Sequence, residues 1–294
     1  MRIEIEYLLV KLLLGIAKII PKKILYIIMQ YLVKFFYYLD SSRRNLTKKN
    51  LSMAFPEKTN KEIILLSKDV YLSLSKTITE ILLMFTNRID IDDMVINKEE
   101  AITQLNEISK KNKNGIIVIT AHFSNWELAA HFLAKHGLPM LAVGREGNNT
   151  KIDQNITVPF RNKFGNHATT KSKAMLAMVK TLKKGGTVGL LIDQKSGHLN
   201  SVKVDFFNQL AETTLSVAIL KNKLNPIVVP IFIARQKNGL YKMIINDPID
   251  YVADEFEKKD EKLKAMTEVY SKEIEDVIRE YPEQWFWMHN RWRR

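Results

Sequence analysis

The sequence predicts an α/β protein with a central mixed sheet flanked by helices, preceded by an apolar N-terminal helical segment. From Gly115 onward, short apolar runs alternate with stretches of helical periodicity, which is typical of a sheet covered by helices. Before that point, residues 1–40 carry apolar side chains around basic stripes. Hydrophobic residues make up 46% of the 294 positions and charged residues 26%, which is enough apolar material for a large core.

The N-terminal segment is expected to form two helices, 3–20 and 22–39, separated by a proline. Glu4, Lys11 and Lys18 are spaced by seven, so they form one stripe on a helix that is otherwise Leu, Ile and Val. Neither helix has the roughly 18–20 uninterrupted apolar residues of a transmembrane span. We interpret both as lying in a membrane interface. A pair of core helices, or a tilted span with snorkelling lysines, are the alternatives.

Basic charge is concentrated in the same region. Residues 1–50 contain ten Lys or Arg and three Asp or Glu, and the whole chain has a net charge of +13. Such a balance indicates an anionic partner: nucleic acid, an anionic membrane surface, or an acidic protein or substrate. Nucleic acid is disfavoured because the basic residues interleave with aliphatic stripes instead of exposed aromatic platforms.

Cysteine is absent from the sequence, which excludes disulfides, thiolate nucleophiles and cysteine metal sites. This composition fits a protein that stays in the cytoplasm. The extreme N-terminus has no basic cluster ahead of its apolar run and no A-x-A cleavage pattern, so a signal peptide is not expected. We therefore expect association with a membrane from its cytoplasmic side.

The rest of the chain divides as follows. A basic connector is expected at 41–49 and an amphipathic helix at 61–86. Strands are expected at 115–120, 138–143, 187–192, 226–234 and 240–245, with helices at 126–136, 171–184, 213–223 and 257–280. The simplest organisation is a membrane-anchoring appendage, residues 1–40, and one α/β domain, residues 41–294.

The best candidate for chemistry lies at the end of the first expected strand. His122 follows this strand and Glu127 lies in the first turn of the next helix, so the carboxylate can reach the imidazole. A carboxylate in that position orients a histidine and makes it more basic, which suits proton removal from a hydroxyl. The structural alternative is a capping box, in which Ser124 and Glu127 only secure the start of the helix.

Other common catalytic patterns are not found in the sequence. It contains no G-x-S-x-G elbow, P-loop, dinucleotide fingerprint or H-E-x-x-H motif. His122, Glu127, His131 and His136 could be imagined as a zinc set. However, an interval of five does not place the last two histidines on one helix face, and His122 precedes that helix. A metal site is therefore not predicted.

Several blocks of sequence follow one another in a recognisable order. They are Arg43–Glu57, the H-x4-[DE] motif at His122–Glu127, a segment from Arg145, Arg161–Gly165, Leu191–Gln194, Phe206–Thr214, Pro230–Arg235 and Trp285–Arg293. Together they resemble the late acyltransferases of lipid A biosynthesis (lauroyl/myristoyl acyltransferases), of the lysophospholipid-acyltransferase-like superfamily. Two departures are visible: Gly144–Gly147 lacks the usual proline, and Asn290 interrupts the usual basic run.

The resemblance implies an acyl transfer without a cofactor. His122 would be the general base for a hydroxyl of the acceptor lipid, and Glu127 would hold its imidazole. The activated oxygen would attack the thioester of acyl-acyl carrier protein directly, without an acyl-enzyme. The substrate-binding residues would be Arg145, Arg161, Asp193 and Gln194. Of these, Arg161 would bind the phosphate or thioester side of the substrates, and Asp193 would have an orienting role. The structural alternative is that Asp193 caps a loop and Arg161 pairs on a surface.

The implied partners are acyl carrier protein with its fatty acyl chain, an anionic lipid acceptor and the cytoplasmic face of the inner membrane, which together fit the basic charge. Three other functions stay open at this point. The same chemistry could act on a lysophospholipid, an aminolipid or another glycolipid. A non-catalytic basic protein could bind membrane or nucleic acid, and a metal-dependent hydrolase would need a metal. Neither acyl chain length nor the acylated hydroxyl follows from the sequence.

Overall fold

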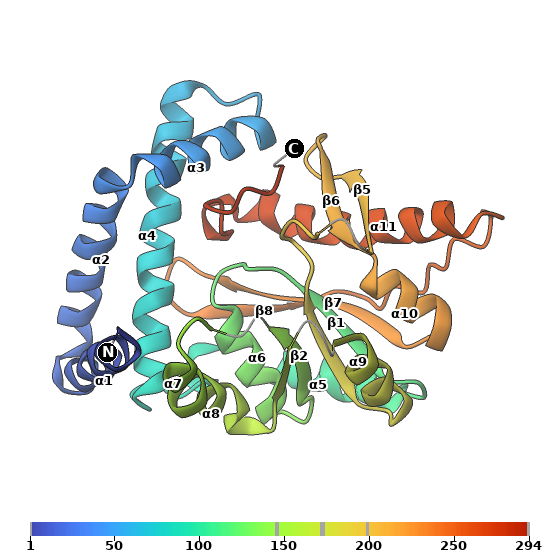
Figure 1. The fold of residues 1–294 in the computed structure, drawn as a ribbon, viewed down its shortest axis with the longest axis horizontal. Helices are drawn as coiled ribbons and strands as arrows, with labels where there is room; N and C mark the ends of the chain where they lie inside the picture. The colour runs from blue at the N-terminus through green and yellow to red at the C-terminus, as the bar shows by residue number, and fades with distance from the viewer. Residues whose placement is uncertain (1, 145–146, 171–173, 198–199, 293–294) are drawn as a thin grey trace.

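The computed structural model describes residues 2–144, 147–170, 174–197 and 200–292 (Figure 1). Its main sheet has six strands in the order β3-β2-β4-β1-β7-β8. These strands are β1 (Ile116–Thr120), β2 (Met140–Gly144), β3 (His167–Thr170), β4 (Thr187–Leu191), β7 (Ile227–Arg235) and β8 (Tyr241–Ile245). Only the β7–β8 pair in this sheet is antiparallel. The predicted mixed sheet is confirmed. A separate hairpin pairs β5 (Ser201–Asp205) with β6 (Leu210–Thr214).

The helices surround this sheet. They are α1 (Arg2–Ile19), α2 (Lys22–Leu39), α3 (Ser41–Ala54), α4 (Asn60–Phe85), α5 (Lys98–Lys110), α6 (Trp126–Lys135), α7 (Thr150–Ile152), α8 (Val158–Arg161), α9 (Ala174–Lys183), α10 (Ser216–Leu224) and α11 (Lys259–Glu280). The first residues of the helix expected at 171–184 lie outside the described residues. The connector expected at 41–49 is wrong: this stretch is helical because the Asp40 side chain caps α3, accepting from the Arg43 amide at 2.9 Å.

The central strand β1 shows how the layers form. Its side chains alternate, with Ile116 and Val118 in one buried cluster and Ile117 and Ile119 in the other. The first cluster contains apolar residues of α5 and α6, and the second contains those of α9, α10 and α11. Because β1 is covered on both faces, its run of β-branched residues is continuous instead of alternating with polar ones.

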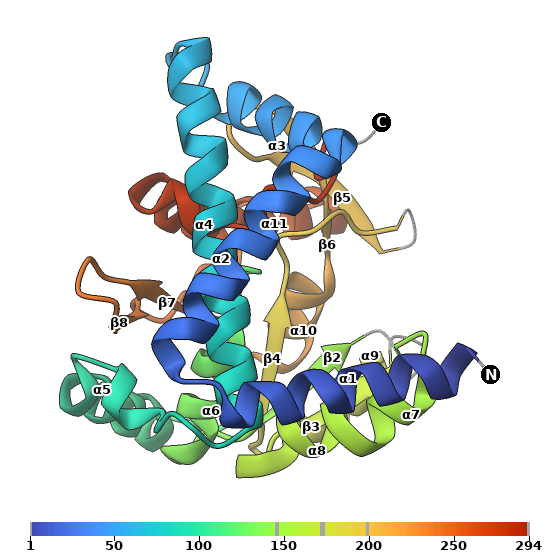
Figure 2. The ribbon, with the colours of Figure 1, turned by 90° about the vertical axis from the view of Figure 1, so that its left-hand side faces the viewer.

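The N-terminal helices stand beside this layered unit. Helix α2 packs against α4, beside it in Figure 1 and in front of it in Figure 2, and buries Leu25, Met29, Val33 and Tyr37, whereas α1 buries only Ala17. The interpretation of α1 and α2 as core helices is wrong, because most of their large apolar side chains are exposed. No helix within the described ranges combines the length and apolarity needed to cross a membrane. The domain boundary at residue 40 stays a prediction.

Candidate active site

The site forms at the carboxyl ends of two neighbouring strands. Parallel strands β1 and β4 are paired in register, with Thr120 opposite Leu191. His122 and Asp193 each come two residues after this last pair, so the chain brings them side by side. In α/β sheets, ligands bind outside the carboxyl ends of the strands. The topology therefore places both residues where chemistry is expected.

Asp193 is the hydrogen-bond partner of the His122 ring. His122 Nδ1 lies 2.9 Å from Asp193 Oδ1, while Oδ2 accepts from the His122 amide at 3.1 Å and from Trp285 Nε1 at 2.8 Å. Burial opposes ionisation of Asp193, but the neighbouring His122 and these donors hold the pKa of its carboxyl below the usual value. An ionised carboxylate can only accept, so Nδ1 carries the hydrogen and Nε2 has the lone pair that can take a proton.

Glu127 is not found beside His122; its expected contact with the imidazole is wrong in this structure. It accepts instead from Arg161, with Nη2 at 2.5 Å and Nε at 3.1 Å from Oε1. Glu127 is buried in the first turn of α6, and Arg161 at the end of α8 is half-buried. The pair therefore joins α6 to α8 and leaves the orientation of His122 to Asp193.

The capping-box alternative is also wrong. The residue that caps α6 is Asn125, whose Oδ1 accepts from the Leu128 amide at 3.1 Å. Ser124 has a φ of 51°, a left-handed conformation that is uncommon for residues other than glycine. Such a strained conformation persists only where several neighbouring contacts hold it in place.

The C-terminal tail supplies much of that constraint. The Ser124 amide donates to Gln284 O at 2.7 Å, and the Phe286 amide donates to His122 O at 3.1 Å. From the other side, Thr77 Oγ1 on α4 donates to Ser124 O at 3.4 Å. The His122 turn is therefore held between α4 and the tail.

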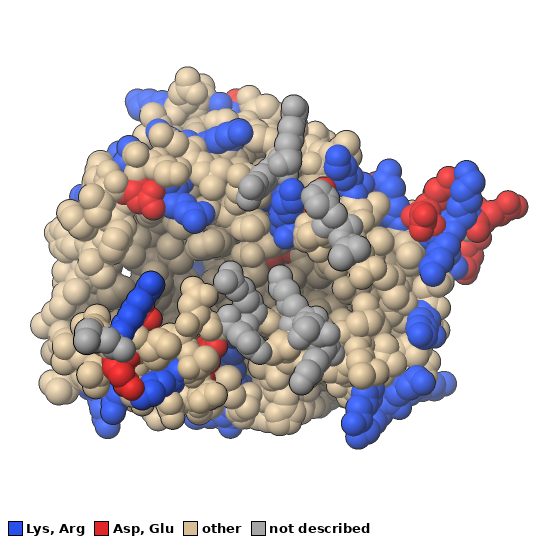
Figure 3. All heavy atoms as spheres, in the orientation of Figure 1, with Lys and Arg blue, Asp and Glu red and all other residues tan. Residues whose placement is uncertain are grey.

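A pocket opens at this turn, and Figure 3 shows this face of the molecule hollowed beside the N-terminal helices. His122 lines this pocket and its side chain is 28% exposed; because Nδ1 is bonded to Asp193, Nε2 is the ring nitrogen left for a substrate. The other lining residues come from α4, the turn and the tail: Val70, Ser73, Leu74, Thr77, Ser124, Trp126, Glu283, Gln284, Trp285, Phe286 and Met288.

The tail is in turn held by α3. Asn50 Nδ2 donates to the carbonyls of Trp287 and His289, each at 2.8 Å, and Arg43 Nη1 donates to Met288 O at 3.0 Å. Both segments stand out in the sequence, but their contact with each other does not. Trp285, Gln284 and Asn50 were missed as site-supporting residues, because nothing in local spacing reports a contact between the two ends of a chain.

The remaining candidate residues lie as follows. Gln194 is half-buried directly after Asp193, while Arg145 lies outside the described residues. His131 Nε2 donates to Phe160 O at 2.9 Å, and burial lowers the pKa of this ring. His136 Nε2 lies 2.8 Å from Asp92 Oδ1. The imagined zinc set is therefore dispersed, and the described part of the chain contains no cluster of three metal-type ligands.

Comparison with known proteins agrees with these observations. A family model described as bacterial lipid A biosynthesis acyltransferase matches residues 1–294. A lipid A biosynthesis acyltransferase of Haemophilus influenzae is 27% identical over 256 residues, covering 85% of this chain and 78% of that protein. The Escherichia coli lipid A biosynthesis lauroyltransferase is 28% identical over 62% of this chain and 57% of its own. The palmitoleoyltransferase of the same organism is 25% identical over 85% of this chain and 79% of its own.

Proposed function

The chain belongs to the bacterial lipid A biosynthesis acyltransferase family, and from this premise we propose that it transfers a fatty acyl chain from acyl-acyl carrier protein to a hydroxyl of a lipid A precursor. It is an acyltransferase of lipid A biosynthesis. The observation that best supports the proposed mechanism is the His122–Asp193 pair, which presents the Nε2 edge of an oriented imidazole at a pocket.

In this mechanism His122 is the general base. Its Nε2 takes the proton of the acceptor hydroxyl as the oxygen attacks the thioester carbonyl carbon. The tetrahedral intermediate collapses, the C–S bond breaks, and the imidazolium returns the proton to the departing thiolate of the carrier. Positioned proton transfer of this kind contributes about 10²–10⁴ in rate. Asp193 fixes the tautomer and stabilises the imidazolium while it exists.

Two further groups suit the charges in this reaction. The amides of Trp126 and Glu127, the first two of α6, have no intrahelical acceptor and can stabilise the oxyanion, whereas the Leu128 amide already donates to Asn125. Arg161 uses Nε and Nη2 for Glu127, so Nη1 is the edge that it offers to a phosphate. Glu127 thereby positions Arg161 in our proposal.

The N-terminal helices would hold this site at the cytoplasmic face of the inner membrane, where the acceptor resides. Their outer surface is apolar and contains, among others, Leu8, Leu9, Leu12 and Leu13, which are 42–61% exposed. Lys11 and Lys18 on the same helix suit an anionic leaflet. In Figure 3 the region around these helices is largely uncharged on its visible face.

We expect the double variant Leu8→Ser/Leu12→Ser to lose binding to vesicles that contain anionic lipid. Both side chains are about 60% exposed, and burying a leucine contributes about 1.5–3 kcal/mol. Affinity for vesicles, measured by cosedimentation, should therefore fall at least tenfold, roughly the equivalent of 1.4 kcal/mol. The matched control is Leu176→Ser on α9. This leucine is 78% exposed, and Figure 1 shows α9 on the opposite side of the molecule from α1. Equal binding by both variants would contradict an interfacial α1.

The proposed function is tested with the wild-type protein, acyl-acyl carrier protein and a lipid A precursor. Mass spectrometry should show the precursor gaining one acyl chain. Acylation of a lysophospholipid in place of the precursor would instead establish the alternative acceptor. No acylated product at all would overturn the proposed activity.

A further inference from the structure

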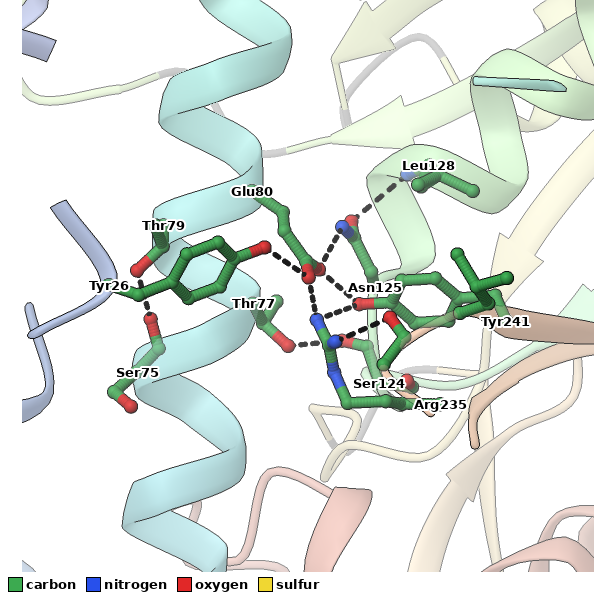
Figure 4. A network of polar contacts seen from close by, with 12 residues as sticks. Tyr26, Ser75, Thr77, Thr79, Glu80, Ser124, Asn125, Leu128, Arg235 and Tyr241 are labelled. Carbon is green, nitrogen blue, oxygen red and sulfur yellow. Dashed lines mark hydrogen bonds and ion pairs between the residues drawn. The ribbon is translucent and has the colours of Figure 1, made fainter. Parts of the chain in front are cut away.

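A buried carboxylate on α4 lies at the centre of a polar network outside the pocket (Figure 4). Glu80 is fully buried and accepts from four side chains: Tyr26 of α2 at 2.8 Å, Asn125 at 3.3 Å, Arg235 of β7 and Tyr241 of β8. An isolated buried carboxylate is costly, and Arg235 offsets its charge. The network thus joins α4 to α2, to the start of α6 and to the hairpin of β7 and β8.

Two arms of this network end at the turn that carries His122. In the first arm, Asn125 donates to Glu80 through Nδ2 while its Oδ1 caps α6, so both ends of one amide are fixed. In the second, the backbone of Arg235 exchanges two hydrogen bonds with the Gln284 side chain, at 2.8 and 2.9 Å. The Gln284 carbonyl then accepts from the Ser124 amide.

We propose that Glu80 is a positioning residue for acyl transfer, acting through Asn125 on the His122 turn. This inference rests on the proposed function. The turn contains a left-handed Ser124, a conformation that relaxes unless its neighbours hold it. Because His122 lies three residues before Asn125, any slackening there displaces Nε2 relative to the acceptor hydroxyl. A displacement of about 1 Å in a reacting group can lower a rate by about 10²-fold.

The variant Glu80→Gln tests this with little change in shape. Tyr26 and Arg235 share Oε1, while Asn125 and Tyr241 share Oε2. The cationic Arg235 will take the one remaining oxygen, which places the new amide against Asn125 and breaks that arm. We expect kcat to fall about 10- to 100-fold with KM nearly unchanged.

A second variant, Asn125→Ser, removes the same hydrogen bond from the other side. Serine is a good N-cap, so α6 keeps its start while the donor to Glu80 is lost. If Glu80 acts through Asn125, the double variant will lose no more kcat than either single variant, instead of the product of the two losses. Multiplying losses would overturn the proposal.

The matched control is Tyr26→Phe, which removes a Glu80 donor on the side away from the turn. It should lower the melting temperature without lowering kcat; an equal fall in kcat would show that Glu80 is merely structural. Hydrogen exchange of the Phe286 amide, bonded to His122 O, reports the turn without any substrate. It should accelerate in Glu80→Gln and not in Tyr26→Phe. This readout stands even if the wild-type protein acylates no lipid, so failure of the two proposals can be told apart.

Discussion

Replacing His122 with alanine is expected to lower kcat for acyl transfer by at least about 10²–10⁴-fold, the usual contribution of a positioned base. In the proposed mechanism Asp193 cannot replace the ring as base, because it is buried behind the imidazole and already accepts three hydrogen bonds. The KM of either substrate should change far less, since the ring acts on the reacting proton. Steady-state kinetics with quantified lipid product separates kcat from KM.

The variant should remain folded, because the His122 backbone keeps its hydrogen bonds to Asp193 and Phe286. Thermal unfolding checks this directly. A suitable control is His167→Ala, which removes an exposed histidine from edge strand β3. Full activity in a folded His122→Ala protein would mean that the H-x4-E motif serves structure alone.

Local patterns located the strand, the turn and His122 correctly. The continuous apolar run of β1 and the periodicity of α6 needed no tertiary information, and both elements begin within a residue of the expected position. The hydrogen-bond partner of the His122 ring could not be predicted from local patterns. The spacing favoured Glu127 because it is near in sequence, whereas Asp193 is 71 residues away. Only the pairing of β1 with β4 brings Asp193 close, and strand order does not follow from periodicity.

Helix α3 was missed for a related reason. Its sequence is polar and basic, without the apolar repeat that marks an amphipathic helix. One of its polar side chains has a structural role in the fold: the buried Asn50 binds the backbone of the tail, and the tail in turn holds the His122 turn. A helix that packs on the backbone carbonyls of an irregular tail needs side-chain donors on its inner face. Apolar periodicity cannot report such a helix.

The substitution Asp193→Asn is expected to lower kcat by about 10³–10⁴-fold, because it reverses the tautomer of His122. The His122 amide and Trp285 Nε1 both donate to Oδ2 and will keep the oxygen of the new amide. Its NH₂ then faces Nδ1, which must accept, so the ring hydrogen moves to Nε2 and the base is lost. In a serine-protease triad, the corresponding change lowers kcat about 10⁴-fold. Nitrogen NMR of labelled histidine reports the tautomer independently of activity.

The same substitution tests the assignment of the two carboxylates when it is compared with Glu127→Gln. Because the pKa of Asp193 is lowered, its ionised form stabilises the fold above about pH 4, the unfolded value, and this stabilisation is lost as pH falls through the folded value. Asp193 is thus charged at pH 7, where the variants are compared.

Glu127→Gln loosens Arg161 and should mainly raise KM for a phosphorylated acceptor. If Glu127→Gln instead gives the larger loss in kcat and shifts the His122 tautomer, then Glu127 orients the base.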